Sequence, residues 1–175
     1  MSDAVLIRAA SLDDAKLYES FMTDIFAENL DTLCPRAQSP TLEQVRSWMA
    51  THTGESSIIF VAESRGDLVG TINLTRFGRP HVNHAIGLGL NVRHGQRNKG
   101  IGKALLQAAL SWFDTVSVLE RIELEVISNN APAIHLYEAF GFEREGVKRK
   151  AVKKGALYFD LHIMSIQKAS RHPLP

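Results

Sequence analysis

Residues 90–110, LNVRHGQRNKGIGKALLQAAL, decide the fold of this chain. An apolar stretch leads into a basic loop with glycines, and the loop leads into apolar residues at helical spacing. This order is typical of a buried strand followed by an amphipathic helix, and therefore of a protein with both α and β structure. The spacing predicts one buried helix face made of Ile101, Ala104, Leu105, Ala108, Ala109 and Trp112.

The loop between this strand and helix is a candidate anion site. The start of a helix leaves four N–H groups without intrahelical partners and carries a partial positive charge. Both properties favour a phosphate or pyrophosphate at that position. Gly100 and Gly102 leave the backbone accessible, and Arg97, Lys99 and Lys103 add positive side chains.

Two common phosphate-binding loops do not fit the sequence. A P-loop requires Lys and Ser or Thr after its second glycine, but Ile101 and Gly102 follow Gly100 here. A Rossmann loop requires a third small residue, and Leu105 stands at that position. These mismatches argue against a nucleotide-binding module.

Two motifs carry a resemblance to a known family. Residues 97–102 have the spacing R-x-x-G-x-G, which resembles the acetyl-CoA signature of the GNAT superfamily of N-acetyltransferases. Residues 130–142, NAPAIHLYEAFGF, are similar to that family's pattern N-x-x-A-x-x-L-Y-x-x-x-G-F. The resemblance implies acetyl-CoA as cosubstrate, held by Leu90, Asn91, Val92, Arg97, Asn98, Lys99, Gly100, Ile101, Gly102, Lys103 and Asn130.

The resemblance also implies a fold. We expect a mixed α/β (α+β) architecture, with a mostly antiparallel central sheet flanked by helices and splayed where acetyl-CoA binds. Residues 1–175 would form a single domain, with a frayed tail at 170–175. In the predicted fourth strand, Gly87 and Gly89 indicate either a bulge that exposes backbone groups to the pantetheine arm or glycines packed beneath a crowded helix.

The same resemblance suggests catalytic roles. Tyr137 would act as a general acid that protonates the leaving thiolate, unless it is a core tyrosine with a satisfied hydroxyl. Many relatives carry Glu where this chain has Gly87, so the proton of the amine must leave through another group or through water. Glu123 is the first candidate for the base and His84 the second. Alternatively, Glu123 is an ion-paired strand residue and His84 a solvated histidine, and neither acts as the base.

Composition limits the remaining function classes. A net charge of +1 argues against a dedicated nucleic-acid surface. No apolar run reaches the length of a membrane span, and the N-terminus does not have the pattern of a signal peptide. One cysteine, Cys34, excludes an internal disulfide and suits a reducing, cytoplasmic compartment. The histidines lack the spacing of a metal site, so no metal is expected.

Local patterns predict the other elements. Ser11 with Asp14, and Thr41 with Gln44, are capping pairs that precede helices, the first helix running to about Leu30. Asn129 or Asn130 starts a short helix that stops at Gly141, and turn signals predict a hairpin at each end of the chain. The predicted strands cover residues 4–7, 58–63, 68–75, 85–92, 121–126 and 159–163.

The predicted activity is transfer of an acetyl group from acetyl-CoA to a primary amine. The tail, residues 143–166, is similar to the ending of bacterial GNAT members that acetylate small amines, including amino acids, and of some that modify ribosomal protein N-termini. A protein N-terminus, a polyamine and a non-catalytic CoA-binding role remain alternatives. A homodimer paired through residues 157–166 is a further expectation. Residues assigned to the acceptor side are Phe26–Leu33, Glu28, Asp31, Arg36, Arg76, Tyr158 and Asp160.

Overall fold

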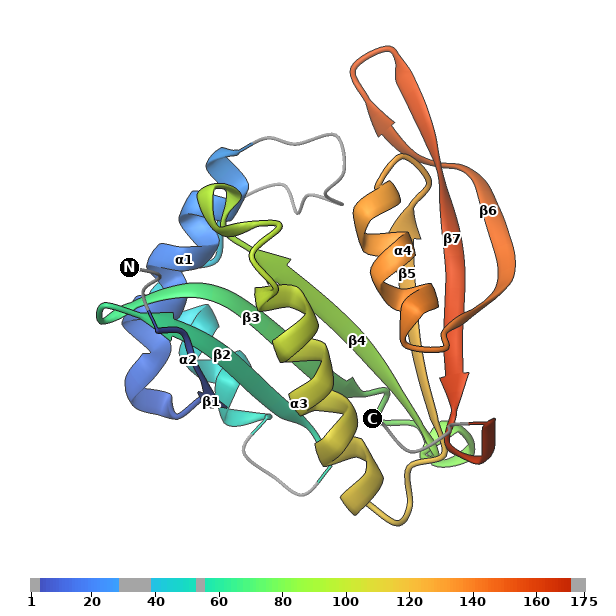
Figure 1. Ribbon diagram of the computed structural model, residues 1–175, viewed down its shortest axis with the longest axis horizontal. Coiled ribbons are helices and arrows are strands. Elements are labelled where there is room, and N and C mark those ends of the chain that lie inside the picture. The colour runs from blue at the N-terminus through green and yellow to red at the C-terminus, as the bar shows by residue number, and fades with distance from the viewer. Residues whose placement is uncertain (1–3, 29–38, 53–55, 171–175) are drawn as a thin grey trace. The chain divides into compact units, whose positions relative to one another are not determined.

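The computed structural model describes residues 4–28, 39–52 and 56–170. The expectations for Asp31, Cys34, Arg36 and the tail beyond Ser170 lie outside these residues. The described chain forms seven strands and four α-helices (Figure 1). In order these are β1 (Leu6–Ala9), α1 (Ala15–Ala27), α2 (Leu42–Ala50), β2 (Ile58–Ser64), β3 (Asp67–Arg76), β4 (Ala85–Val92), α3 (Ile101–Thr115), β5 (Arg121–Ile127), α4 (Ala131–Ala139), β6 (Glu143–Lys154) and β7 (Leu157–Gln167).

The strands form one mixed sheet in the order β1-β2-β3-β4-β5-β7-β6. Antiparallel pairs join β1 to β2, β2 to β3, β5 to β7 and β6 to β7. Strands β4 and β5 run parallel and pair through Ala85–Arg121, Ile86–Ile122 and Gly87–Glu123. The mixed, mostly antiparallel α/β fold expected from the sequence is therefore confirmed.

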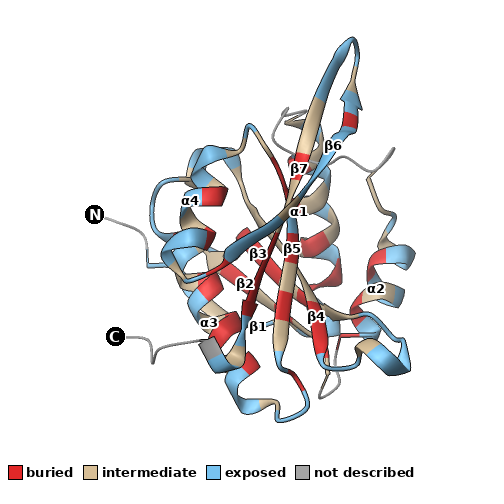
Figure 2. Cartoon of the chain, turned by 90° about the vertical axis from the view of Figure 1, so that its right-hand side faces the viewer, coloured by how far each residue is buried: buried red, intermediate tan, exposed pale blue. Residues whose placement is uncertain are grey.

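The chain divides into two compact units that share β4. The first contains β1–β3, α1–α3 and residues 88–92 of β4, and the second contains residues 85–87 of β4 together with β5–β7 and α4. In the first unit, α2 and α3 lie on opposite sides of the strands (Figure 2). A Cβ placed at Gly70 of β3 would lie 3.0 Å from both Ile101 and Leu105, so β3 and α3 pack with almost no space between them.

The buried face of α3 differs from the predicted one. Ile101, Leu105 and Ala109 are buried as expected, whereas Ala104, Ala108 and Trp112 are only partly buried. The other buried residues of the helix are Leu106, Leu110 and Phe113. The apolar stripe of this helix is wide, and burying leucine and phenylalanine side chains removes more apolar area from water than burying alanines. The helix therefore turns its larger side chains toward the sheet.

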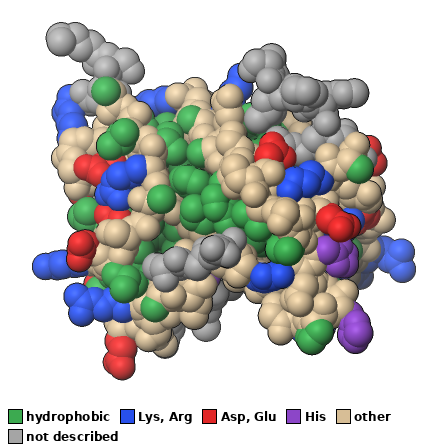
Figure 3. Space-filling view, turned by 90° about the horizontal axis from the view of Figure 1, so that it is seen from below, with side chains coloured by type: hydrophobic (Ala, Val, Ile, Leu, Met, Phe, Trp, Pro, Cys, Tyr) green, Lys and Arg blue, Asp and Glu red, His purple; other side chains and the backbone are tan. Residues whose placement is uncertain are grey.

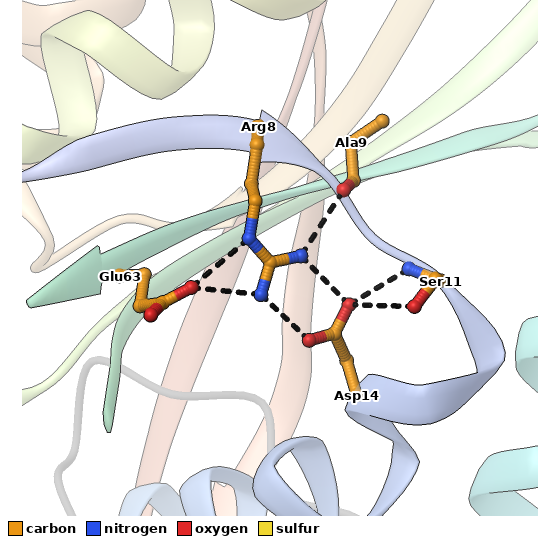
Figure 4. A network of polar contacts seen from close by, with 5 residues as sticks. All are labelled: Arg8, Ala9, Ser11, Asp14 and Glu63. Carbon is orange, nitrogen blue, oxygen red and sulfur yellow. Dashed lines mark hydrogen bonds and ion pairs between the residues drawn. The ribbon is translucent and has the colours of Figure 1, made fainter. Parts of the chain in front are cut away.

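The N-terminal strand is shifted from its predicted position. The sequence predicted residues 4–7, but β1 is Leu6–Ala9 and includes Arg8. Figure 4 shows why a charged residue can occupy this strand: the Arg8 guanidinium binds Asp14 through Nη2 at 2.7 Å and Glu63 through Nη2 at 2.8 Å. The Asp14 carboxylate also accepts the Ser11 N–H at 2.7 Å, as the predicted capping pair requires. These bonds to Arg8 lower the pKa of Asp14.

The other local predictions fit the structure closely. Thr41 Oγ1 accepts the Gln44 N–H at 3.3 Å, and Gln44 Oε1 accepts the Thr41 N–H at 2.9 Å, which starts α2. Arg65 and Gly66 both have positive φ, as the two-residue turn between β2 and β3 requires. At the C-terminal end the sequence predicted one strand, at residues 159–163, whereas β7 covers Leu157–Gln167. No predicted strand covered β6, which has 12 residues and pairs with β7 through two register shifts, so it has no regular alternation.

Charged residues of both signs occupy the margins of the face shown in Figure 3, with hydrophobic side chains near its middle. This mixture agrees with the net charge of +1. Within the described ranges, no helix is long and apolar enough to cross a membrane.

Candidate active site

The predicted anion loop ends at an uncapped helix start. Gly100 precedes α3 with φ of +81°, a conformation that glycine adopts without strain, and offers no side chain to cap the helix. The first intrahelical bond runs from the Ala104 N–H to the Gly100 carbonyl at 3.0 Å. The N–H groups of Ile101, Gly102 and Lys103 precede that bond, so helical geometry leaves them without intrahelical partners. The start of α3 can therefore bind an anion through its backbone.

The Arg97 side chain is held from two sides. Its Nε donates to the Val92 carbonyl at 2.9 Å, and its Nη2 pairs with Glu28 at the end of α1. Glu28 Oε1 also accepts the His94 N–H at 2.8 Å, and the Glu28 side chain is only 14% exposed. The sequence predicted Arg97 as a cofactor ligand and Glu28 as an acceptor residue, but it did not predict their contact. Residues 69 positions apart give no sequence signal of such proximity.

The other predicted cofactor residues of this unit surround the same turn. Lys99 and Lys103 are exposed, and Lys99 Nζ donates to Gln96 Oε1 at 3.1 Å. Asn98 has φ of +60°, a value that asparagine tolerates better than most residues. Leu90, Asn91 and Val92 are half-buried at the end of β4. Lys99 and Lys103 therefore lie at the surface, near the first N–H groups of α3.

The second motif forms α4 in the other unit. Asn130 caps this helix, accepting the Ala133 N–H through its side chain at 3.3 Å. Tyr137 is 6% exposed and packs its ring 5.6 Å from that of Phe142. Burial raises the pKa of the Tyr137 phenol above its ordinary value, which makes it a weaker acid than a solvated tyrosine. The burial agrees with the alternative of a core tyrosine, and the general-acid role stays a prediction.

Glu123, the first candidate for the base, lies beside the glycine that replaces the usual carboxylate. Gly87 and Glu123 are direct partners in the parallel pairing of β4 and β5. Paired residues on neighbouring strands point to the same face of the sheet. The Glu123 carboxylate therefore projects to the face toward which a side chain at position 87 would point. Arg121 Nε holds this carboxylate at 3.2 Å and also binds Glu145.

The remaining candidates are at the surface. His84 is exposed just before β4, where its carbonyl accepts the Glu120 N–H at 2.8 Å and the Arg121 N–H at 3.1 Å. Tyr158 is exposed, with Lys150 and Lys153 over its ring. Asp160 accepts the Lys150 N–H at 2.7 Å. Across the described ranges, no group of three or more His, Cys, Asp or Glu residues could hold a metal ion.

Sequence analysis missed a polar network in the first unit. Asn73, Thr75 and His52 form a chain of hydrogen bonds between β3 and the end of α2. A Cβ at Gly89 would lie 2.7 Å from Asn73 Oδ1, so Gly89 is packed beneath this amide. Gly89 is closely packed, but the group that covers it is the Asn73 side chain of β3 and not the helix that the sequence analysis expected.

Comparison with known proteins gives consistent matches. A family model described as Acetyltransferase (GNAT) family matches residues 18–142. The L-amino acid N-acetyltransferase AaaT of Escherichia coli K12 is 34% identical over 100 residues, which span 57% of this chain and 62% of that protein. The alignment therefore covers somewhat less than two thirds of that relative.

Solved structures match over nearly the whole chain. A GNAT-family acetyltransferase from Streptococcus pneumoniae has a TM-score of 0.88 and 26% identity, covering 94% of this chain and 99% of that one. A protein from Salmonella typhimurium, solved with its cofactor acetyl-CoA, has a TM-score of 0.84 over 99% of this chain and 98% of that one. At 18% identity this second match supports the fold alone.

Proposed function

The chain belongs to the GNAT family of acetyltransferases, and on this premise we propose that it transfers the acetyl group of acetyl-CoA to the primary amine of a small molecule such as an amino acid. The observation that carries this proposal is the uncapped start of α3, where N–H groups follow a basic R-x-x-G-x-G loop. Such a helix start suits the pyrophosphate of CoA. The match to residues 18–142 includes parts of both units and supports one acetyltransferase domain over residues 1–175.

The residues proposed to hold acetyl-CoA act mainly through the backbone. Ile101, Gly102 and Lys103 would supply N–H groups to the phosphates, with Lys99 and Arg97 contributing positive charge. Strand groups of Leu90, Asn91 and Val92 would pair with the amides of the pantetheine arm. The proposed acetyl-CoA ligands also include Asn98, Gly100 and Asn130. Gly100 would contribute through its backbone, which has positive φ, and Asn130 through its side-chain amide.

The reaction needs one proton removed and one supplied. The amine nitrogen attacks the acetyl carbonyl carbon, the carbon–sulfur bond breaks, and the thiolate leaves. Tyr137 would protonate the departing sulfur as the general acid, the role that the family motif in α4 implies. The proton of the amine would pass to Glu123, since this carboxylate lies beside Gly87 on the neighbouring strand. His84, or a chain of water, is the alternative base.

The proposed acceptor follows from the relatives. The E. coli protein with 34% identity is named an L-amino acid N-acetyltransferase, which supports a free amino acid as the acceptor. A protein N-terminus or a polyamine is the alternative. Tyr158, Asp160, Glu28 and Arg76 are the described residues proposed for the acceptor side.

A cytoplasmic homodimer completes the proposal, and the single cysteine supports the reducing compartment. The proposed pairing through residues 157–166 would have to use the part of β7 that β5 does not cover. Within the described residues, β5 pairs with β7 from Leu161 onward, whereas β6 pairs with β7 from Leu157. Strand β6 is the outer strand of this unit and is a second edge through which a dimer could pair. Sedimentation velocity measures the oligomeric state directly.

The experiment that tests the activity measures thiol release from acetyl-CoA across free amino acids, polyamines and N-terminal peptides. We expect turnover on amino acids, and a fall in kcat of about 100-fold in Tyr137→Phe. Tyr18→Phe is the matched control, because Tyr18 is a buried tyrosine of α1 outside the proposed site. Turnover on peptides or polyamines alone would replace the acceptor, and absence of turnover on every amine would contradict the proposed function.

A further inference from the structure

Strand β3 presents polar side chains on one face and apolar ones on the other. Gly70, Ile72 and Leu74 alternate along the face that meets α3. The opposite face carries Thr71, Asn73 and Thr75. Thr71 is 1% exposed, and its Oγ1 has no hydrogen-bond partner within the described residues. Asn73 and Thr75 are half-buried, so parts of both residues remain exposed to solvent.

His52 fixes the direction of the hydrogen bonds on this face. Its Nδ1 lies 2.9 Å from the Trp48 carbonyl and 3.0 Å from Thr51 Oγ1, and its Nε2 lies 2.7 Å from Thr75 Oγ1. The Thr51 hydroxyl donates its proton to the Trp48 carbonyl at 2.7 Å, so Nδ1 faces two acceptors and carries the proton. In the neutral imidazole Nε2 is then an acceptor. His52 is 5% exposed, and burial lowers its pKa, which favours the neutral ring.

The orientation of the Asn73 amide follows from this assignment. Thr75 has one hydroxyl proton, and it donates that proton to His52 Nε2. Thr75 Oγ1 then accepts a bond from its other neighbour, Asn73 Nδ2, at 2.9 Å. The amide NH2 of Asn73 is thus held by Thr75, and the amide oxygen Oδ1 points over Gly89 of β4. A side chain at position 89 would displace this oxygen, because its Cβ would lie 2.7 Å away.

This oxygen lies over the residue that precedes the proposed thioester-binding strand segment. Gly89 is followed directly by Leu90, Asn91 and Val92. An amide oxygen is a neutral acceptor that can bind the N–H of an amine. Unlike a carboxylate, it adds no negative charge that would favour the protonated ammonium, and only the neutral amine has a lone pair to attack a carbonyl.

We propose that Asn73 Oδ1 accepts a hydrogen bond from the incoming primary amine and positions it for attack, with Thr75 and His52 as positioning residues that hold the amide in this orientation. The inference rests on the proposed N-acetyltransferase activity. It assigns to β3 a substrate contact that neither of the two sequence motifs contains. Its chemistry requires an acceptor with at least one N–H left to donate while the nitrogen attacks, which a primary amine provides.

The test compares two substitutions of similar size at Thr75. Thr75→Val removes the hydroxyl and Thr75→Ser retains it. We expect Thr75→Val and Asn73→Ala to lower kcat/KM for the amine about 10- to 100-fold, with the KM for acetyl-CoA within about twofold of wild type. Thr75→Ser should stay within about threefold of wild type. Thermal unfolding establishes that each variant is folded at the assay temperature.

A second readout does not depend on turnover. Nitrogen-15 NMR of the imidazole rings should show His52 as the neutral tautomer protonated at Nδ1, with its Nε2 signal shifted in Thr75→Val and close to wild type in Thr75→Ser. If the wild type turns over and kcat/KM for the amine is unchanged in Asn73→Ala and Thr75→Val, this inference is overturned but the proposed function is not. Protonation of His52 at Nε2 would have the same consequence. A wild type without turnover on any amine would overturn the proposed function and this inference with it.

Discussion

Two arginines in this protein each bind two carboxylates, and their surroundings differ. Arg8 of β1 binds Asp14 and Glu63 (Figure 4), and Arg121 of β5 binds Glu123 and Glu145. Asp14 is 5% exposed, and its carboxylate is also bonded to the Ser11 N–H. The side chains of Glu123 and Glu145 are each 37% exposed.

The difference separates a structural role from a chemical one. The Asp14 carboxylate is buried, so its charge needs Arg8 for compensation. Glu123 stays accessible to solvent, and its partner Arg121 has a second carboxylate in Glu145. The same arrangement of charges therefore stabilises the fold in one unit and holds a candidate proton acceptor in the other. Four predictions test this distinction.

The largest effect is expected at Glu123. Glu123→Gln removes the proposed base but keeps the shape of the side chain, so kcat should fall about 100- to 1000-fold. The free energy of unfolding should change little, because an exposed ion pair contributes at most about 1 kcal/mol. Steady-state kinetics and urea denaturation measure the two quantities.

Glu125→Gln provides the comparison, because Glu125 lies two residues along the same face of β5 and pairs with Lys148. A fall in kcat for Glu125→Gln in place of Glu123→Gln would move the base to Glu125. Unchanged kcat in both variants would leave His84 or water as the base.

A smaller effect, on stability, is expected at Asp14. Asp14→Asn removes the buried charge that compensates Arg8, and the free energy of unfolding should fall by about 2–4 kcal/mol. The kcat of the folded variant should remain near wild type. Asp13→Asn is the control, since Asp13 is an exposed carboxylate of the same turn. Equal losses of unfolding free energy in Asp14→Asn and Asp13→Asn would show that the contacts of Asp14 drawn in Figure 4 do not stabilise the fold.

Arg97 and Glu28 form a third pair, at the proposed phosphate loop. Glu28→Gln keeps an oxygen that can accept the His94 N–H and removes a negative charge beside the anion site. Acetyl-CoA should therefore bind about 3- to 10-fold more tightly at low salt, with a smaller gain at high salt. Isothermal titration calorimetry measures this change. The control is Asp24→Asn, at a more exposed pair with Arg93, which should change the affinity for acetyl-CoA less. Weaker binding of acetyl-CoA in Glu28→Gln would contradict the prediction and would mean that the Glu28 charge is needed to order the loop at residues 97–102.

The smallest effect concerns Glu145 and pH. Bonds from Arg121, and from the Ser165 hydroxyl at 2.7 Å, lower the pKa of Glu145 from 4.5 to about 2. A depressed carboxyl pKa contributes stability above the unfolded pKa, and this contribution is lost as the pH falls from about 4.5 to about 2. The exposure of the side chain keeps the contribution small. The free energy of unfolding of Glu145→Gln should therefore depend less on pH in this window than that of wild type. Urea denaturation at several pH values measures this dependence, and equal slopes of unfolding free energy against pH in the two proteins would contradict the prediction.

Local patterns predicted most of the fold. The strand at residues 85–92, the cap at Thr41 and Gln44, and the stop of α4 at Gly141 are confirmed within a residue, because each depends on a short stretch of chain. The face of α3 was partly wrong, since a wide apolar stripe allows several rotations and only the packed sheet selects one. The strand ending before Arg8 was wrong because the partners of Arg8 lie on other elements.

For the candidate site as well, local features could be predicted and long-range contacts could not. The two motifs could be predicted from the sequence because a phosphate loop and a helix cap are local structures. Glu28 beside Arg97 and His52 beside Thr75 could not be predicted, because each contact joins elements far apart in sequence. Glu123 was chosen from its place on a strand, and the structure adds that its partner is Gly87. The catalytic assignments remain predictions.

The sharing of β4 between the two units has a consequence for protein synthesis. Every segment of the first unit has been made once the ribosome has passed Val116, whereas residues 77–87 of the second unit must wait for the segment that begins at Ser117. At about 5–20 residues per second, residues 117–175 take roughly 3–12 s to synthesise. During that interval the start of β4 has no β5 to pair with, so Ala85 and Ile86, which are buried in the complete fold, lack the strand that they pair with.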